Sequence, residues 1–138
     1  MSTNDYSVFI EDFADRHFIS IFAKKYKGKQ WEITLKAIKE MLSRYDNFVN
    51  ANISTSSKID FICSCNGYSI IKLDFKIAGS NISAKSSGNR VVAAVDIVKK
   101  IIKILLVYSK NDIGPPNETA KWKNMVTDFY PEFNELKK

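Results

Sequence analysis

Hydrophobic residues recur at helical spacing through the first third of the chain. Phe18–Tyr26 carries an aromatic side chain at every fourth position, and Trp31–Tyr45 carries a second apolar stripe. A repeat of three to four residues is typical of helices with one buried face. We therefore expect two helices, the first capped by Asp12 or Asp15, after a short strand at Tyr6–Ile10.

The hydrophobic period changes to two at Ile59, which indicates β-strands. Every second residue from Ile59 to Cys65 is expected on one face of the first of them. Asn66-Gly67 then predicts a tight hairpin turn. In the returning strand Lys72 and Lys76 alternate with apolar residues, so both lysines are expected on the face opposite to those residues.

Two further strands are predicted at Arg90–Val98 and Ile101–Ser109, joined by a two-residue turn at Lys99-Lys100. This register sets Asp96 opposite Lys103, a favourable cross-strand pair of charges. It also gives one face of the hairpin a wholly apolar composition, which supports the alignment. A polar, serine-rich loop at residues 79–88 precedes the hairpin.

A last helix is expected to begin at Asn117, as its cap, and to stop at Pro131. Its inward positions are Trp122, Met125, Val126 and Phe129. The predicted order is β-α-α-β-β-β-β-α, and helices before a mostly antiparallel sheet are typical of the α+β class. The chain has 138 residues and no internal repeat or linker-like segment, so residues 1–138 are expected to form a single domain.

The net charge of +6 is concentrated in one segment of the chain. Residues 72–110 contain eight basic and two acidic side chains, whereas the rest of the chain has as many acids as bases. A single surface lysine usually serves solubility. A segment that holds all of the excess charge suits an anionic partner such as RNA.

Several functional classes are disfavoured by what the sequence lacks. It has no phosphate-binding loop and no zinc-protease or serine-hydrolase motif, and His17 is its only histidine. Cys63 and Cys65 have no second Cys/His pair to complete a metal site. No segment is long and apolar enough to span a membrane, and the polar N-terminus is unlike a signal peptide. We therefore expect a cytoplasmic protein with no cofactor and no metal.

Two segments carry a pattern of their own: KSSGNRVV at residues 85–92 and ILLVYSK at residues 104–110. A glycine in the turn lets the backbone approach an anion closely, and Arg90 offers a planar fork that matches a phosphate. With two helices before them and one after, these segments resemble the RelE/ParE superfamily of toxins from bacterial type II toxin–antitoxin systems. The match is specific at Lys85, Gly88, Arg90, Tyr108 and Lys110.

The resemblance implies both a fold and a mechanism. The fold is a twisted, mainly antiparallel sheet with the two N-terminal helices packed on one face, followed by a C-terminal helix. RelE-like members are ribosome-dependent endoribonucleases that cut mRNA without a metal, by attack of a 2′-hydroxyl on the adjacent phosphate. By this resemblance Arg90 stabilises the phosphate, while Lys85 and Lys110 add charge or serve as the base. The residues implied in holding the RNA are Lys72, Lys76 and Lys103.

Tyr108 is a further candidate of the same resemblance. The register predicted above turns it to the apolar face, away from Arg90, and packing is then its favoured role. Only a bulge late in the strand would bring it to the side of Arg90. Asn89 also stands where the family usually has an aromatic residue, and the first turns of the last helix lack the tyrosine that RelE-like members often keep there. The acid–base pair is therefore unassigned.

Three functions fit these features. The first is an mRNA interferase of the RelE type, the second is a ParE-like toxin that inhibits a type II topoisomerase, and the third is a non-catalytic binding protein of the same fold. The expected partners are a cognate antitoxin and RNA, in the first case mRNA on the ribosome. No membrane partner is expected.

Overall fold

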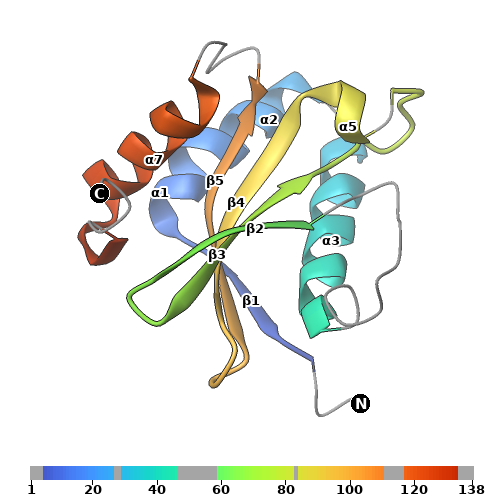
Figure 1. Ribbon diagram of the computed structural model, residues 1–138. Coiled ribbons are helices and arrows are strands. Elements are labelled where there is room, and N and C mark those ends of the chain that lie inside the picture. The colour runs from blue at the N-terminus through green and yellow to red at the C-terminus, as the bar shows by residue number, and fades with distance from the viewer. Residues whose placement is uncertain (1–4, 27–28, 47–58, 83, 111–116, 134–138) are drawn as a thin grey trace.

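Five strands form one mixed sheet in the order β1-β5-β4-β3-β2 (Figure 1). The computed structural model describes residues 5–26, 29–46, 59–82, 84–110 and 117–133. The strands from β2 to β5 are antiparallel neighbours, whereas β1 runs parallel to β5. The strands are β1 (Ser7–Ile10), β2 (Ile59–Cys65), β3 (Tyr68–Asp74), β4 (Asn89–Asp96) and β5 (Ile101–Ser109).

Helices cover both faces of this sheet. One helical segment follows β1 and consists of α1 (Asp12–Ala14), the π-helical turn η1 (Asp15–Ile19) and α2 (Ser20–Lys25). The segment α2 and helix α3 (Gln30–Ser43) pack on one face, and α7 (Glu118–Phe129) packs on the other (Figure 1). The α+β class is confirmed, and the expected helices and strands follow one another as predicted, with one added helix between β3 and β4.

Each face of the sheet has its own hydrophobic core, because alternate strand residues point to opposite sides. The first core joins α2 and α3 to the sheet through Phe22, Trp31, Ile38, Ile71 and Val91. The second core joins α7 to the sheet, and its buried members include Ile70, Val92, Leu106, Trp122 and Val126. The central strand β4 is buried along almost its whole length, which explains its unbroken apolar run.

The first helix begins differently from the expectation. Glu11 occupies the N-cap position and makes no side-chain capping bond, so neither Asp12 nor Asp15 is the cap. Asp15 instead opens the π-helical turn, where the backbone N–H of Ser20 donates to the Asp15 carbonyl. Phe22 is buried in α2, whereas Tyr26 lies at the C-cap, where the chain leaves the helix, and is only half-buried.

A bulge in β2 breaks the predicted alternation. Phe61 pairs with Ile71, but Cys63 pairs with Ile70, so one residue of β2 is left over between them. Ile59 therefore packs against the α3 core, whereas Cys65 is buried in the α7 core. The prediction that Ile59 to Cys65 share one face at alternate positions is wrong, because a bulge exchanges the faces beyond it.

The hairpin of β4 and β5 also has a different register. Its turn spans four residues, 97–100, so that Asp96 opposes Ile101 and Lys103 opposes Ala94. The predicted Asp96–Lys103 pair is therefore wrong. Asp96 instead accepts a hydrogen bond of 3.0 Å from the backbone N–H of Lys99, which closes the turn. Lys100 has a positive φ of 58° in this turn, a conformation that a Lys-Lys pair in the sequence does not indicate.

The C-terminal helix α7 is confirmed, with Trp122 and Val126 buried. Phe129 was expected inward, but it is 53% exposed and stacks on Phe13 with ring centroids 3.8 Å apart. Asn117 stands at the N-cap position without a side-chain capping bond. The polar loop before β4 contains a short helical turn, α5 (Ala84–Ser87).

Candidate functional site

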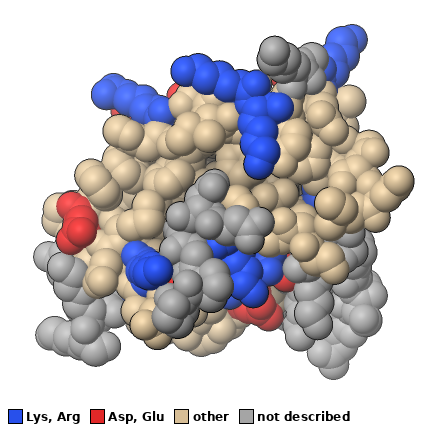
Figure 2. Space-filling view, turned by 90° about the horizontal axis from the view of Figure 1, so that it is seen from above, with Lys and Arg blue, Asp and Glu red and all other residues tan. Residues whose placement is uncertain are grey.

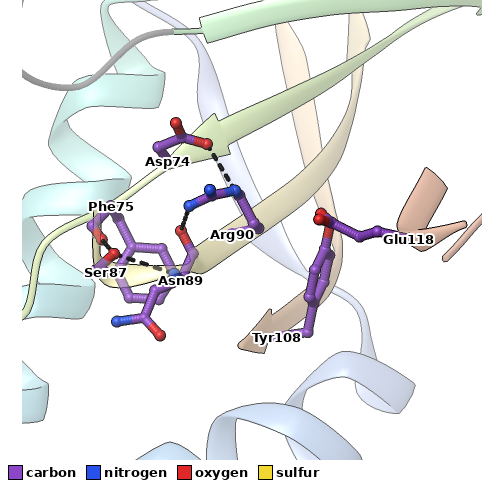
Figure 3. A network of polar contacts seen from close by, with 7 residues as sticks. All are labelled: Asp74, Phe75, Ser87, Asn89, Arg90, Tyr108 and Glu118. Carbon is purple, nitrogen blue, oxygen red and sulfur yellow. Dashed lines mark hydrogen bonds and ion pairs between the residues drawn. The ribbon is translucent and has the colours of Figure 1, made fainter. Parts of the chain in front are cut away.

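A row of three polar side chains crosses the sheet where β3 ends and β4 begins. Asp74 of β3 pairs with Arg90 of β4, and Arg90 pairs with Tyr108 of β5. Directly paired residues point to the same face, so the three side chains meet on the α7 side of the sheet (Figure 3). Glu118, in the first turn of α7, closes the row. We call these four residues the Arg90 network.

Tyr108 reaches this row because β5 contains a bulge. The ladder shifts between Val92 and Ala93, which pair with Leu106 and Ile104, so Leu105 is left over. Leu105 and Leu106 then both face α7, and Tyr108 turns to the side of Arg90. The expected apolar-face position of Tyr108 is wrong, because the bulge that would bring it round is present.

Arg90 is buried, at 7% exposure, and its partners lie within the protein. Its Nε lies 3.0 Å from Asp74 Oδ1, and its Nη1 donates to the Asn89 carbonyl at 3.0 Å. Burial raises the pKa of Asp74, and the positive charge of Arg90 offsets part of that rise. A buried guanidinium needs such a partner, because an unpaired buried charge is strongly unfavourable.

Tyr108 is a hydrogen-bond donor in this site. Its hydroxyl donates to Glu118 Oε2 at 2.6 Å. Burial, followed by the hydrogen bond and the negative charge of Glu118, raises the pKa of the Tyr108 hydroxyl far above its ordinary value. Tyr108 therefore keeps its proton at neutral pH and cannot act as a general base in this arrangement.

The turn at Ser87 and Gly88, directly before β4, is tied to the ends of β3 and β5, and we call it the Arg90 turn. Ser87 donates to the Phe75 carbonyl at 2.8 Å, and the N–H of Asn89 donates back to Ser87 at 3.0 Å (Figure 3). Gly88 has a φ of 76°, and a Cβ there would lie 3.3 Å from the Cβ of Lys110. Both the φ and this close approach favour glycine. The Lys110 N–H also donates to the Gly88 carbonyl at 2.6 Å.

The lysines predicted for the site are spread over the sheet. Lys110 directly follows β5 and Lys76 lies two residues after β3; both are exposed beside this turn. Lys72 is half-buried and lies two residues before Asp74, on the same face. Lys85 lies in α5, ahead of the same turn. Lys103 opposes Ala94, four residues along β4 from Arg90, which is about 13 Å away in an extended strand.

Lys103 has local partners instead. Its Nζ lies 5.2 Å from the centre of the Tyr68 ring, a cation–π distance. The hydrogen bond with Tyr68 raises the pKa of Lys103. Lys103 thus belongs to the region around the β2–β3 turn rather than to the Arg90 network.

The end of the molecule that carries the Arg90 turn is rich in lysine. Lys24 and Lys25 lie in the last turn of α2, and Lys29 is the N-cap of α3. Both helix ends adjoin the end of β3, because Phe22 contacts Phe75 and Trp31 contacts Phe75. With Lys76 and Lys110 they form a surface that we call the basic end. Figure 2 looks onto this end and shows blue side chains spread over it.

Sequence reasoning named Arg90, Lys110 and Lys76, which lie at this end. It missed Glu118, which is 28 residues from Arg90 in the sequence and meets Tyr108 only through folding. An acid in the first turn of a helix is common for electrostatic reasons, so its presence alone carries no signal.

The described part of the chain holds no cluster of three or more metal-binding side chains and no helix long and apolar enough to cross a membrane. Comparisons with protein-family models, with curated proteins and with solved structures gave no match for this chain.

Proposed function

We propose that this protein binds RNA through its basic end, as the toxin of a bacterial type II toxin–antitoxin pair. The distribution of charge at that end supports the proposal best. Lys76 and Lys110 are exposed beside the Arg90 turn. Asp74 and Glu118, the acids of the Arg90 network, already accept from Arg90 and Tyr108. These two carboxylates are therefore engaged inside the network and do not neutralise the exposed lysines. An RNA phosphate backbone would meet the positive charge of those lysines.

Cleavage of ribosome-bound mRNA is the second candidate function, and the bulge in β5 favours it. The bulge sets Tyr108 directly opposite Arg90, so a hydroxyl donor and a guanidinium share one place on the sheet. Cleavage would need Arg90 to exchange Asp74 for a phosphate. In the present arrangement Arg90 is buried and paired, so the geometry supports RNA binding more directly than catalysis.

The salt dependence of RNA binding tests the first function. Binding of a labelled single-stranded RNA should weaken as KCl rises, because lysines displace counterions from phosphates. The double variant Lys76→Ala/Lys110→Ala should lower the slope of log Kd against log salt by about 0.7 for each lost contact. Fluorescence anisotropy over a series of KCl concentrations measures both quantities.

A matched variant controls for the loss of net charge. Lys39 and Lys99 are exposed, and they lie in the third turn of α3 and at the tip of the β4–β5 hairpin. Lys39→Ala/Lys99→Ala removes the same two charges and should keep the slope of the unmodified protein. An equal slope for both double variants, or no RNA binding at all, would remove the basic end as the RNA site.

A further inference from the structure

A groove lies where β5 runs beyond β1. The parallel pairing of β1 ends with Ile10 opposite Ile104, and the chain then turns into α1. The strand β5 continues to Ser109, so within the described residues its last part has no strand on that side. The helices α2 and α7 flank this stretch, and the space between them is a groove of about 680 Å³.

The groove is apolar over most of its lining. Phe22 and Val107 are buried at its floor, and Ile21 stands at its edge with 56% of its surface exposed. Phe18 and Met125, both half-buried, complete the apolar part. A volume between about 300 and 1,000 Å³ with a mainly apolar lining is typical of small-molecule sites.

The polar groups of the groove gather on α7 and at the end of β5. Lys121, Asn124 and Tyr108 are its polar lining residues. Lys121 and Met125 are four residues apart, so they lie one above the other on the same face of α7. The first turn of α7 adjoins Tyr108 through Glu118, which puts Lys121 nearer than Met125 to the basic end. The groove therefore has a cationic end and an apolar body.

We propose that this groove binds an amphiphilic carboxylate, such as a medium-chain fatty acid. The hydrocarbon chain would lie against Phe18, Phe22 and Met125, and the carboxylate would lie beside Lys121 with Asn124 as an amide donor. Charge favours an anionic head group over a neutral or cationic one, because Lys121 lines the groove and Lys24 and Lys25 add positive charge at the end of α2, outside the lining. The chain contributes through burial and the head group through charge, so the two can be tested separately.

This site shares Tyr108 with the Arg90 network and lies beside Lys24 and Lys25 of the basic end, but its test uses other residues than the test of the RNA function. Neither Lys76 nor Lys110 lines the groove, and Lys121 is not part of the Arg90 network. RNA binding could fail while the carboxylate binds, and the reverse is also measurable. The two proposals therefore stand or fall on different variants.

Equilibrium dialysis with dodecanoate, dodecanol and dodecyltrimethylammonium, each below its micelle-forming concentration, tests the proposal. Dodecanoate should bind about tenfold or more tightly than dodecanol, and the cation should bind most weakly. From octanoate to dodecanoate the Kd should fall about three- to fourfold for each added methylene, because each one is buried in the groove. Absence of dodecanoate binding would overturn the proposal.

Three substitutions place the ligand. Lys121→Glu should weaken dodecanoate binding at least tenfold and leave dodecanol binding unchanged. Lys123→Glu makes the same charge change on α7 outside the groove lining and should change neither. Ile21→Glu should weaken both ligands, and its high exposure keeps the fold intact, which an unchanged melting temperature verifies. Equal binding of all three amphiphiles, unaffected by Lys121→Glu, would reduce the result to adsorption on apolar surface and overturn the site.

Discussion

Arg90 shows how burial decides what a single residue can do. Its neighbours in sequence, a serine-glycine turn and a run of valines, are compatible with a phosphate ligand and with a structural ion pair alike. The structure sets its Nε 3.0 Å from Asp74 Oδ1, and the two side chains are only 9% and 16% exposed. Both partners of such a buried ion pair are needed for stability, because removing either one leaves an unpaired charge inside the protein.

Removal of one partner should therefore cost more than removal of both. We expect Arg90→Ala to lower the free energy of unfolding by about 3–5 kcal/mol, because Asp74 would remain buried without its cation. The double variant Arg90→Met/Asp74→Leu should recover most of that loss, because apolar side chains of similar volume can replace a buried pair. Urea denaturation of the two variants and of the unmodified protein measures the difference.

The same pair of variants separates structure from function. Lys110→Ala, at an exposed position, is the control and should change the unfolding free energy by less than about 0.5 kcal/mol. If Arg90 also stabilises a phosphate during cleavage, the double variant would be stable yet at least about 100-fold slower on ribosome-bound mRNA. A mild effect of Arg90→Ala on stability would contradict the structural role.

Among the helices and strands, local sequence patterns were least informative about which face of the sheet each strand residue points to. The period of two in Ile59–Cys65 and in Ile101–Ser109 correctly predicted strands, and Asn66-Gly67 correctly predicted the turn between β2 and β3. Both strands nevertheless contain a bulge, and each bulge moves the residues after it to the other face. A bulge is fixed by how two strands fit between the helices on either side, so the alternation of one strand does not reveal it.

Two side chains that face each other across β2 and β3 give a prediction about burial at the edge of the sheet. Phe61 and Ile71 oppose each other across the ladder, yet Phe61 is 60% exposed on the edge strand and Ile71 is 1% exposed. Phe61→Lys should leave stability almost unchanged and reduce self-association, because a charge protects an open sheet edge. Ile71→Ala should cost about 2–5 kcal/mol by opening a cavity in the α3 core.

Thermal unfolding and sedimentation measure these two effects. The matched pair is informative because the two residues are neighbours in one ladder and differ mainly in burial. A loss of stability in Phe61→Lys as large as that in Ile71→Ala would show that the Phe61 side chain is buried rather than exposed on the edge strand.

The whole molecule combines charge from segments that lie far apart in the sequence. Composition alone predicted that residues 72–110 hold the excess charge, and Lys76 and Lys110 are indeed exposed at one end of the sheet. Folding then adds Lys24, Lys25 and Lys29, which no sequence pattern groups with them, and places Lys103 beside Tyr68 instead. The basic end is therefore a product of topology, because helix ends and strand ends meet there.

The toxin proposal makes its own prediction at this scale, in the cell. Expression of the protein alone should slow growth, and incorporation of labelled amino acids should fall before incorporation of labelled thymidine, because RNA binding or cleavage stops translation first. The reverse order would favour inhibition of a type II topoisomerase.

Lys76→Glu/Lys110→Glu should abolish the growth effect by repelling phosphates, whereas Lys39→Glu/Lys99→Glu makes the same charge change away from the basic end and should keep it. Co-expression of a small acidic antitoxin should restore growth, because it would cover the same lysines. Normal growth at a verified level of folded protein would contradict the toxin proposal and leave RNA binding as a separate question.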